Sequence, residues 1–271
     1  MPELPEVEIT RRGLAAALSG QRIVRVVIRN ASLRWPIPKQ LAALLAGKTI
    51  REVRRRAKYL LLDCSDGALI VHLGMSGSLR ILREGCAAAA HDHFDLILEN
   101  GVMLRLRDPR RFGAVLWQDG DPLTHPLLAG LGPEPLSDQF SGAVLHKATR
   151  GRSASIKALL LDSRIVAGIG NIYANEALYA AAIRPSAPAG RLSRGRCERL
   201  VIALKQTLEA ALAAGGSSLR DYVASDGEFG CFQLQYAVYG RANLPCPQCS
   251  SPVRALRIGQ RSTFYCACCQ R

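Results

Sequence analysis

The first twenty residues carry an apolar pattern that repeats every three to four positions. Val7, Leu14 and Leu18 fall on one face of a helix drawn through this segment, and Gly20 ends it. Pro5 suits the first position of a helix, and the acidic residues around it suit its positive N-terminal end. The pattern predicts a helix over residues 5–18.

The next hundred residues change to short runs with a strand period. The runs are rich in β-branched residues, and turn sequences such as SDG and ENG separate them. They cover residues 21–30, 49–63, 68–73, 93–99, 102–107 and 113–118. Many short strands with tight turns predict an antiparallel β-sandwich or barrel.

The pattern changes again at residues 119–138, which hold four prolines and three glycines. Helical periods follow over residues 155–165, 172–181 and 196–214. The tail from residue 240 has few apolar residues and needs a cross-link to fold. We therefore expect an α+β chain of several domains, divided at 1–130, 131–235 and 236–271.

Charge points to a polyanionic partner. The chain has 36 Lys and Arg against 22 Asp and Glu, a net charge of +14. Nucleic acid is the first candidate, an anionic membrane surface the second, and a basic surface kept for solubility the third. No apolar run approaches the ~20 residues of a membrane span, and the acidic start is unlike an export signal. We expect a soluble, intracellular protein.

Five of the nine cysteines lie close to the C-terminus. CPQC at 246–249 and CACC at 266–269 give two pairs with the spacing of a structural four-cysteine zinc site. Cys268 offers an alternative ligand, but Cys266 and Cys269 repeat the spacing of Cys246 and Cys249. We predict a closed, structural zinc site on a β-hairpin.

Other segments carry residues that suit DNA contact, each with a plainer alternative. Phe112 lies between arginine and glycine in DPRRFGA, where it would wedge into a duplex or fold into the core. Met75, in HLGMSGSLR, is by default a packing residue. Asn171 is the last residue of GIGN. This segment is either a phosphate-binding site at the start of a helix or a turn that only packs two helices together. His91 and His93 share one face of the expected strand, which could suggest a metal site. A role in DNA contact or in the structure is the stronger interpretation, because no third ligand is nearby in the sequence.

Taken together, eight segments resemble one family. In chain order they are MPELPEVE, RRAKYLLL, HLGMSGSLR, DPRRFGA, LGPEPL, GIGNIYANE, VYGR and the cysteine tail with QRSTFYC. Their order and spacing are similar to those of bacterial formamidopyrimidine-DNA glycosylases. The endonuclease VIII branch shares the architecture but typically has Gly at the fourth position and lacks the LGMSG and DPRRF pair.

The resemblance implies a fold: an N-terminal antiparallel β-sandwich capped by the first helix, a helical domain with a helix–two-turn–helix motif, and a four-cysteine zinc-finger hairpin. It also implies a bifunctional DNA glycosylase and abasic-site lyase of base excision repair. Such an enzyme excises oxidised purines such as 8-oxoguanine and formamidopyrimidines, then nicks the strand by β,δ-elimination. The alternatives are an endonuclease VIII-type glycosylase for oxidised pyrimidines and a non-catalytic damaged-DNA-binding module.

The resemblance assigns the chemistry to four residues and to no organic cofactor. Pro2, exposed by removal of Met1, is the nucleophile that forms a Schiff base with the sugar. Glu3 is the general acid/base of ring opening. Lys58 and Arg261 serve the β- and δ-eliminations.

The resemblance also supplies the DNA contacts and the partner. The partner is double-stranded DNA with oxidised bases or abasic sites, which would lie in the basic cleft between the domains. The enzyme would act as a monomer in the bacterial cytoplasm. Residues 226–241 belong to the family's loop over the everted base, and Lys157 and Arg220 are weaker candidates for contacts. The side chains that fill the gap or hold the DNA are Met75, Arg110, Phe112, His72, His91, Arg152, Asn171 and Tyr239.

Overall fold

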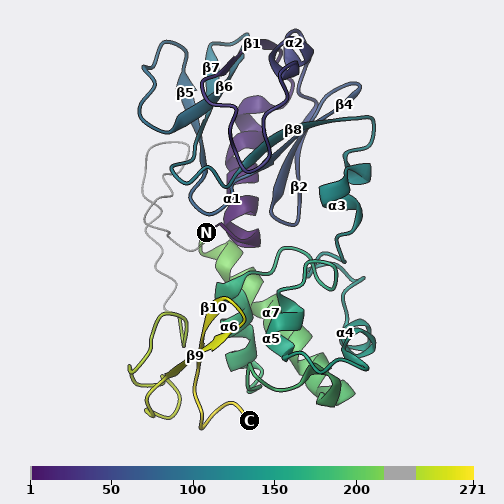
Figure 1. The fold of residues 1–271 in the computed structure, drawn as a ribbon, viewed down its shortest axis with the longest axis vertical. Helices are drawn as coiled ribbons and strands as arrows, with labels where there is room; N and C mark the ends of the chain where they lie inside the picture. The colour runs from purple at the N-terminus through teal and green to yellow at the C-terminus, as the bar shows by residue number, and fades with distance from the viewer. Residues whose placement is uncertain (1, 217–235) are drawn as a thin grey trace. The chain divides into compact units, whose positions relative to one another are not determined.

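The computed structural model describes residues 2–216 and 236–271 and divides them into two compact units (Figure 1). Residues 2–129 with 215–216 form the first unit, and residues 130–214 with 236–271 form the second. Arg220, Cys231 and most of the predicted loop over the everted base lie outside the described residues.

The N-terminal helix α1 spans Leu4–Leu18, which confirms the helix predicted from the apolar period. Glu3 is its N-cap, so Pro5 occupies the second helical position rather than the first. The face with Val7, Leu14 and Leu18 is buried, and it packs against strands of both sheets of the first unit. The helix thereby closes one side of the core that the sheets enclose.

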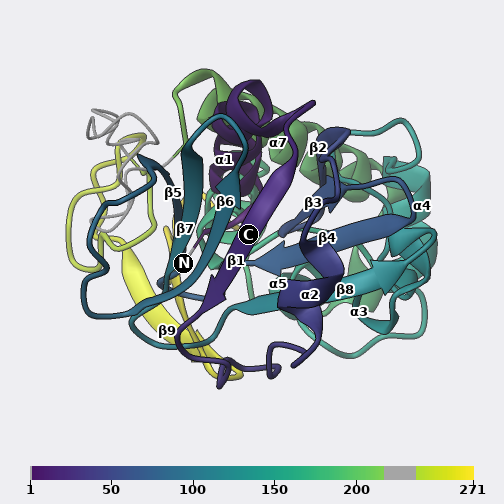
Figure 2. The same cartoon turned by 90° about the horizontal axis from the view of Figure 1, so that it is seen from above.

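Eight strands form the two antiparallel sheets of the first unit. Figure 2 shows them from above, with neighbouring strands side by side. One sheet has the order β1 (Ile23–Ile28), β6 (Asp92–Leu98), β7 (Val102–Arg107) and β5 (Ser78–Arg83). The other has the order β2 (Glu52–Arg56), β3 (Tyr59–Asp63), β4 (Gly67–His72) and β8 (Ala114–Asp119). Apolar residues of both sheets and of α1 share one core, as the predicted β-sandwich requires.

One local prediction in this unit was wrong, and two elements were missed. The run 49–63 is not one strand: it folds back at Ala57, which has a φ of 53°, and gives the hairpin of β2 and β3. Strand β5 was not predicted, because it lies at a sheet edge where its last four residues are only partly buried or exposed. The short helix α2 (Leu41–Leu45) was also missed.

The second unit is helical. After η1 (Pro122–Thr124) and α3 (Pro126–Ala129), the chain forms α4 (Gly142–Thr149), α5 (Ile156–Leu160), α6 (Asn171–Ala180), η2 (Ala189–Arg191) and α7 (Arg194–Ala213). Helices α4 and α6 pack against α7 around a core that includes Phe140 and Tyr173. Helix α5 stops well before residue 165, because the Asp162 carboxylate accepts the Arg164 backbone N–H and turns the chain.

The C-terminal segment forms the predicted hairpin of β9 (Arg254–Ile258) and β10 (Arg261–Tyr265). Its own apolar core is small and consists of Val238, Val253 and cysteine side chains. Such a core is too small to hold the segment together, so the cysteine cluster is the natural cross-link.

Candidate active site and nucleic-acid interface

The chain begins with a buried acidic turn. Glu3 and Glu6 are 1% and 2% exposed, and the Glu3 backbone N–H donates to Glu6 Oε2 at 2.8 Å. The two carboxylates form a reciprocal capping box at the start of α1. Pro2 immediately precedes this box and is buried with it. The helix therefore fixes the position of Glu3 and the direction in which the chain presents Pro2.

Glu8 forms ion pairs with arginines of α1 and β2. Its carboxylate pairs with Arg11 at 2.9 Å, with Arg12 at 3.1 Å and with Arg55 of β2 at 3.0 Å. Burial would raise the pKa of Glu8, but hydrogen bonds from Arg11 and Arg55 outweigh it and lower the pKa. Glu8 ties α1 to the sheet and is a structural residue.

Lys58 and His72 lie near each other at the end of the β2–β3 hairpin. Lys58 follows the turn at Ala57, and the adjacent Tyr59 pairs with His72 of β4. Burial, with smaller effects of Lys58 and Arg34, lowers the pKa of His72 to about 4. Its Nδ1 accepts the Gly74 backbone N–H at 3.0 Å, so the neutral ring carries its proton on Nε2. His72 thus offers a hydrogen-bond donor without a charge at neutral pH.

The apolar side chains predicted to enter the duplex are exposed. Met75 is 40% exposed and Phe112 is 42% exposed, which removes the alternative that Phe112 packs in the core. The Arg110 guanidinium lies 4.8 Å from the centroid of the Phe112 ring. A hollow of about 500 Å³ adjoins them, lined by Ser32, Leu33, Arg34, Arg110, Arg111 and Phe112. An exposed apolar pair with arginines around it suits insertion into stacked bases.

The two histidines of HDH take separate roles, and neither suits a metal. His91 has a φ of 73° and precedes β6, so it lies outside the strand that holds His93, although the two ring centroids are 6.3 Å apart. His91 is exposed, whereas His93 is 6% exposed and its Nε2 lies 2.9 Å from the Asp108 carbonyl oxygen. Within the described residues, neither histidine belongs to a group of metal-ligand side chains.

In the second unit, side chains of α5 and α6 hold the hairpin of β9 and β10. Asn171 Nδ2 donates to the Ser262 carbonyl at 3.0 Å, and Lys157 Nζ donates to the same carbonyl at 2.9 Å. Lys157 also donates to Thr263 Oγ1 at 2.7 Å and is fully buried. These contacts fix the hairpin beside Arg261, the exposed first residue of β10.

The backbone at Tyr239 is held by a carboxylate that the sequence analysis missed. Glu176 accepts the backbone N–H groups of Ala237, Val238 and Tyr239 at 2.8, 3.1 and 2.8 Å. The Tyr239 ring packs edge-on against Phe264 of the hairpin, with centroids 5.4 Å apart. The only signal for Glu176 was its place at the end of GIGNIYANE. Arg152, by contrast, is exposed and donates to the Ala148 carbonyl at 3.0 Å.

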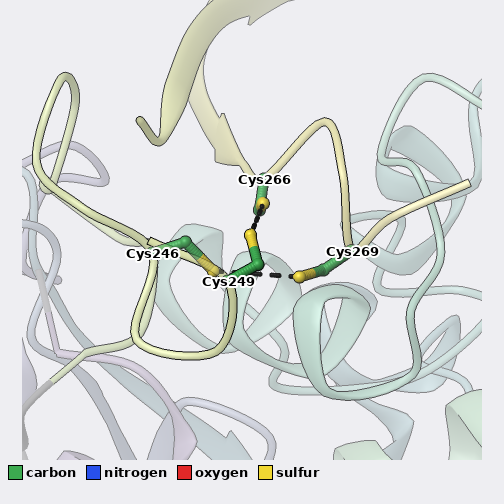
Figure 3. A group of neighbouring side chains, drawn as sticks. All are labelled: Cys246, Cys249, Cys266 and Cys269. Atoms are coloured by element: carbon green, nitrogen blue, oxygen red, sulfur yellow. Dashed lines mark hydrogen bonds between the residues drawn. The ribbon is translucent and has the colours of Figure 1, made fainter. Parts of the chain in front are cut away.

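Four cysteines converge on one point, as Figure 3 shows. The Cys246 and Cys269 sulfurs are 3.9 Å apart, those of Cys249 and Cys266 are 3.4 Å apart, and all four lie within 4.8 Å of one another. A tetrahedral ion with Zn–S bonds of about 2.3 Å needs sulfurs about 3.8 Å apart, so the donor set fits zinc. Cys268 lies outside this group.

A tyrosine supports the cluster from α6. The Tyr179 hydroxyl lies 3.2 Å from the Cys246 sulfur, the contact expected of a group that orients a ligand thiolate. The exposed Cys268 sulfur instead lies 3.2 Å from Ser251 Oγ. All four positions around the ion are filled by protein, so the site is structural.

No helix in the described part of the chain is long and apolar enough to cross a membrane.

Family models match most of the chain. The Formamidopyrimidine-DNA glycosylase N-terminal domain matches residues 1–115, the Formamidopyrimidine-DNA glycosylase H2TH domain matches 131–223, and the zinc finger found in FPG and IleRS matches 243–271. The curated formamidopyrimidine-DNA glycosylase of Aromatoleum aromaticum is 56% identical over 271 residues, covering all of both chains.

Solved structures agree with these matches. The Fpg protein of Thermus thermophilus is 41% identical with a TM-score of 0.89, covering 99% of this chain and 98% of that one. The Lactococcus lactis Fpg protein, in a complex with DNA that contains N7-benzyl-Fapy-dG, is 32% identical with a TM-score of 0.91 over the whole of both chains. The chain therefore belongs to the formamidopyrimidine-DNA glycosylase family.

Proposed function

We propose that the chain is a bifunctional DNA glycosylase and abasic-site lyase of base excision repair. It removes oxidised purines, such as 8-oxoguanine and formamidopyrimidines, from duplex DNA and then nicks the strand. The observation that carries this proposal is the N-terminal arrangement, in which Pro2 directly precedes a capped helix and a buried Glu3. Relatives that share more than half of the sequence over full length carry the glycosylase name.

The chemistry begins when removal of Met1 makes the Pro2 nitrogen a secondary amine. The nitrogen attacks the sugar C1′, the bond from C1′ to the damaged base breaks, and the base leaves with the bonding electrons and a proton. Glu3 protonates the sugar ring oxygen as the ring opens, which gives an iminium at C1′. The iminium is an electron sink: loss of a proton from C2′ expels the first phosphate from C3′, and loss of a proton from C4′ then expels the second from C5′.

Two basic residues assist the eliminations. Lys58 donates a proton and contacts the phosphate of the first elimination. Arg261 stays protonated, so its part is to hold the second phosphate and stabilise the charge that leaves with it. Asn171 and Lys157 support this role by holding the Ser262 backbone next to Arg261.

DNA binding uses side chains of both units. We propose that Met75, Arg110 and Phe112 fill the gap left by the everted base. His72, His91, Arg152, Asn171 and Tyr239 hold the DNA. A structural zinc, held by the four cysteines, fixes the hairpin and takes no part in the chemistry. The division at 1–130, 131–235 and 236–271 is supported by the three family-model ranges.

We also propose that the enzyme acts in the bacterial cytoplasm as a single chain. Its bacterial relatives and the location of bacterial DNA support this assignment.

The decisive test is borohydride trapping on a duplex with 8-oxoguanine opposite cytosine. We expect a covalent adduct on the peptide that begins at Pro2, found by mass spectrometry. A Pro2→Gly variant should trap less while it binds the duplex normally. Pro126→Gly, at an exposed proline that begins α3, is the matched control and should trap like the wild type.

The outcomes separate the alternatives. An adduct on a lysine would keep the reaction class but overturn the nucleophile. Tight binding without any adduct would favour a binding module, and trapping only on oxidised pyrimidines would favour the endonuclease VIII type.

A further inference from the structure

Three loops of the first unit carry the side chains proposed to probe the duplex. The loops connect different pairs of strands and have no sequence in common. The side chains are Met75 on the loop 73–77, His91 at the end of the connection 84–91, and Arg110 and Phe112 on the loop 108–113.

One buried carboxylate joins two of these loops. Asp108 is 0% exposed, and its Oδ1 accepts a hydrogen bond from Ser76 Oγ at 2.7 Å. Its Oδ2 accepts the Gly113 backbone N–H at 2.8 Å. Ser76 Oγ in turn accepts the Arg110 backbone N–H at 3.1 Å. Ser76, the residue next to Met75, is thus bonded to Asp108 and Arg110 in the loop that carries Phe112, and Asp108 bonds the other end of that loop at Gly113.

The backbone of Asp108 holds the third loop. Its N–H donates to the His91 carbonyl at 3.0 Å. Its carbonyl accepts the Arg111 N–H at 3.1 Å and lies 2.9 Å from His93 Nε2. A carbonyl only accepts, so His93 carries its proton on Nε2. Asp108 therefore uses its N–H, its carbonyl and both carboxylate oxygens to gather the three loops.

The loops also meet without free space between their backbones. Gly74 has a φ of +62°, and a Cβ on it would lie 2.4 Å from the Phe112 carbonyl carbon. A Cβ on Gly113 would lie 2.7 Å from the His72 carbonyl oxygen. No side chain fits at either position, so the backbones pack directly against each other.

We propose that Asp108 is a positioning residue for base eversion. Its hydrogen bonds hold the loops that carry the four probing side chains together, so these side chains enter the duplex as one preformed unit. Eversion requires unstacking, and a probe that first had to be ordered would spend part of its binding free energy on that ordering. The inference rests on the proposed function and adds a residue that touches neither the base nor the reacting sugar.

The test compares a substrate that needs eversion of a base with one that has no base. Ser76→Ala removes the bridge, and Ser76→Thr restores its hydroxyl. Ser65→Ala, in the exposed turn between β3 and β4, is the matched control. Excision of 8-oxoguanine and nicking of a preformed abasic site are measured at single turnover. Fluorescence of 2-aminopurine beside the lesion reports unstacking.

For Ser76→Ala we expect excision to slow about ten-fold and abasic nicking to change less than about three-fold, the scale of one hydrogen bond to a buried charge. Unstacking should slow with excision, and Ser76→Thr should restore both. Asp108→Asn keeps the shape and lets an amide donate to Ser76 Oγ, so it should lose less than Ser76→Ala.

Equal losses on both substrates, or no loss on either, would show that the bridge only stabilises the fold and would overturn the inference. If the wild-type protein acted on neither substrate, the proposed function itself would be refuted, whatever the variants did.

Discussion

Arg105 is the buried cation on which the β6–β7 pair depends. It is 3% exposed, and its guanidinium donates to both oxygens of Asp95, each at 2.8 Å. It also lies 3.4 Å from an Asp92 oxygen and donates to the carbonyls of Cys86 and Ala87 at 3.0 and 2.8 Å. We predict that Arg105→Met destabilises the first unit severely.

The magnitude follows from the charges that are left behind. Asp95 is 1% exposed and Asp92 is 7% exposed, so the variant buries two carboxylates without their main cation. Removing one partner of a buried ion pair costs about 3–5 kcal/mol. With a urea m-value of about 2 kcal/mol per molar, the unfolding midpoint should fall by about 2 M.

The pH dependence gives an independent check. Burial would raise the pKa of Asp95, but hydrogen bonds from Arg105 and Arg29 outweigh it and hold the pKa below its ordinary value. A carboxylate whose pKa is lowered in the folded state stabilises the fold at pH values above its unfolded-state pKa of about 3.9. This stabilisation is lost as the pH falls through the folded-state pKa. In Arg105→Met, loss of the Arg105 hydrogen bonds raises the pKa of Asp95 relative to the wild type, while Arg29 still pairs with it. The stability gap between variant and wild type should therefore narrow as the pH falls through the folded-state pKa values of Asp95 in the two proteins.

Tryptophan fluorescence can follow this unit alone, because Trp35 and Trp117 are the two tryptophans of the chain and both lie in it. The matched control is Arg25→Met in the same sheet. Arg25 pairs with Glu84 at 2.6 Å, but both side chains are exposed, so its loss should cost under about 1 kcal/mol. Equal midpoint shifts for the two variants would refute the argument from burial.

Two further predictions concern the second unit. Removing zinc with a chelator, or Cys266→Ala, should unfold the hairpin and abolish DNA binding while tryptophan fluorescence of the first unit stays native; full affinity in the metal-free protein would contradict this. Lys157→Met should weaken hairpin attachment by about 1–3 kcal/mol through its lost hydrogen bonds to Ser262 and Thr263, and should speed zinc release to a colorimetric chelator. Zinc release at the wild-type rate would show that the buried ammonium is not needed to hold the hairpin.

The features predicted well from the sequence are those set by neighbours along the chain. The face of α1 follows from a period within fifteen residues, and the zinc ligands follow from two local CxxC spacings. The exposed state of Phe112 could not be decided in the same way. In the folded protein, Gly74 packs against the Phe112 backbone and Ser76 bonds the Arg110 backbone of the same loop, and both lie more than thirty positions earlier than Phe112.

The supporting polar residues were missed for the same reason. Asp108 looks like part of a basic loop motif, and Glu176 looks like an ordinary polar position in the middle of a helix. Their partners are backbone N–H groups and the Ser76 hydroxyl, up to 63 positions away, and a backbone group leaves no mark in the sequence. Edge strand β5 escaped because partial burial weakens the alternation that identifies a strand.

The two units solve one physical problem by similar means. A side chain that touches DNA must be exposed, and exposed side chains on loops lose order easily. In the first unit, buried Asp108 fixes the backbone beneath Arg110 and Phe112. In the second, Glu176 fixes the backbone of Tyr239 through three N–H groups.

Charged acceptors suit this task, because a carboxylate takes several donors and bonds them more strongly than a neutral oxygen does. Eversion of a base costs a few kcal/mol, which must come from binding. Loops ordered in advance leave more of the binding free energy for that step. On this argument, Asp108 and Glu176 order the surfaces that we propose contact the DNA rather than repel the DNA.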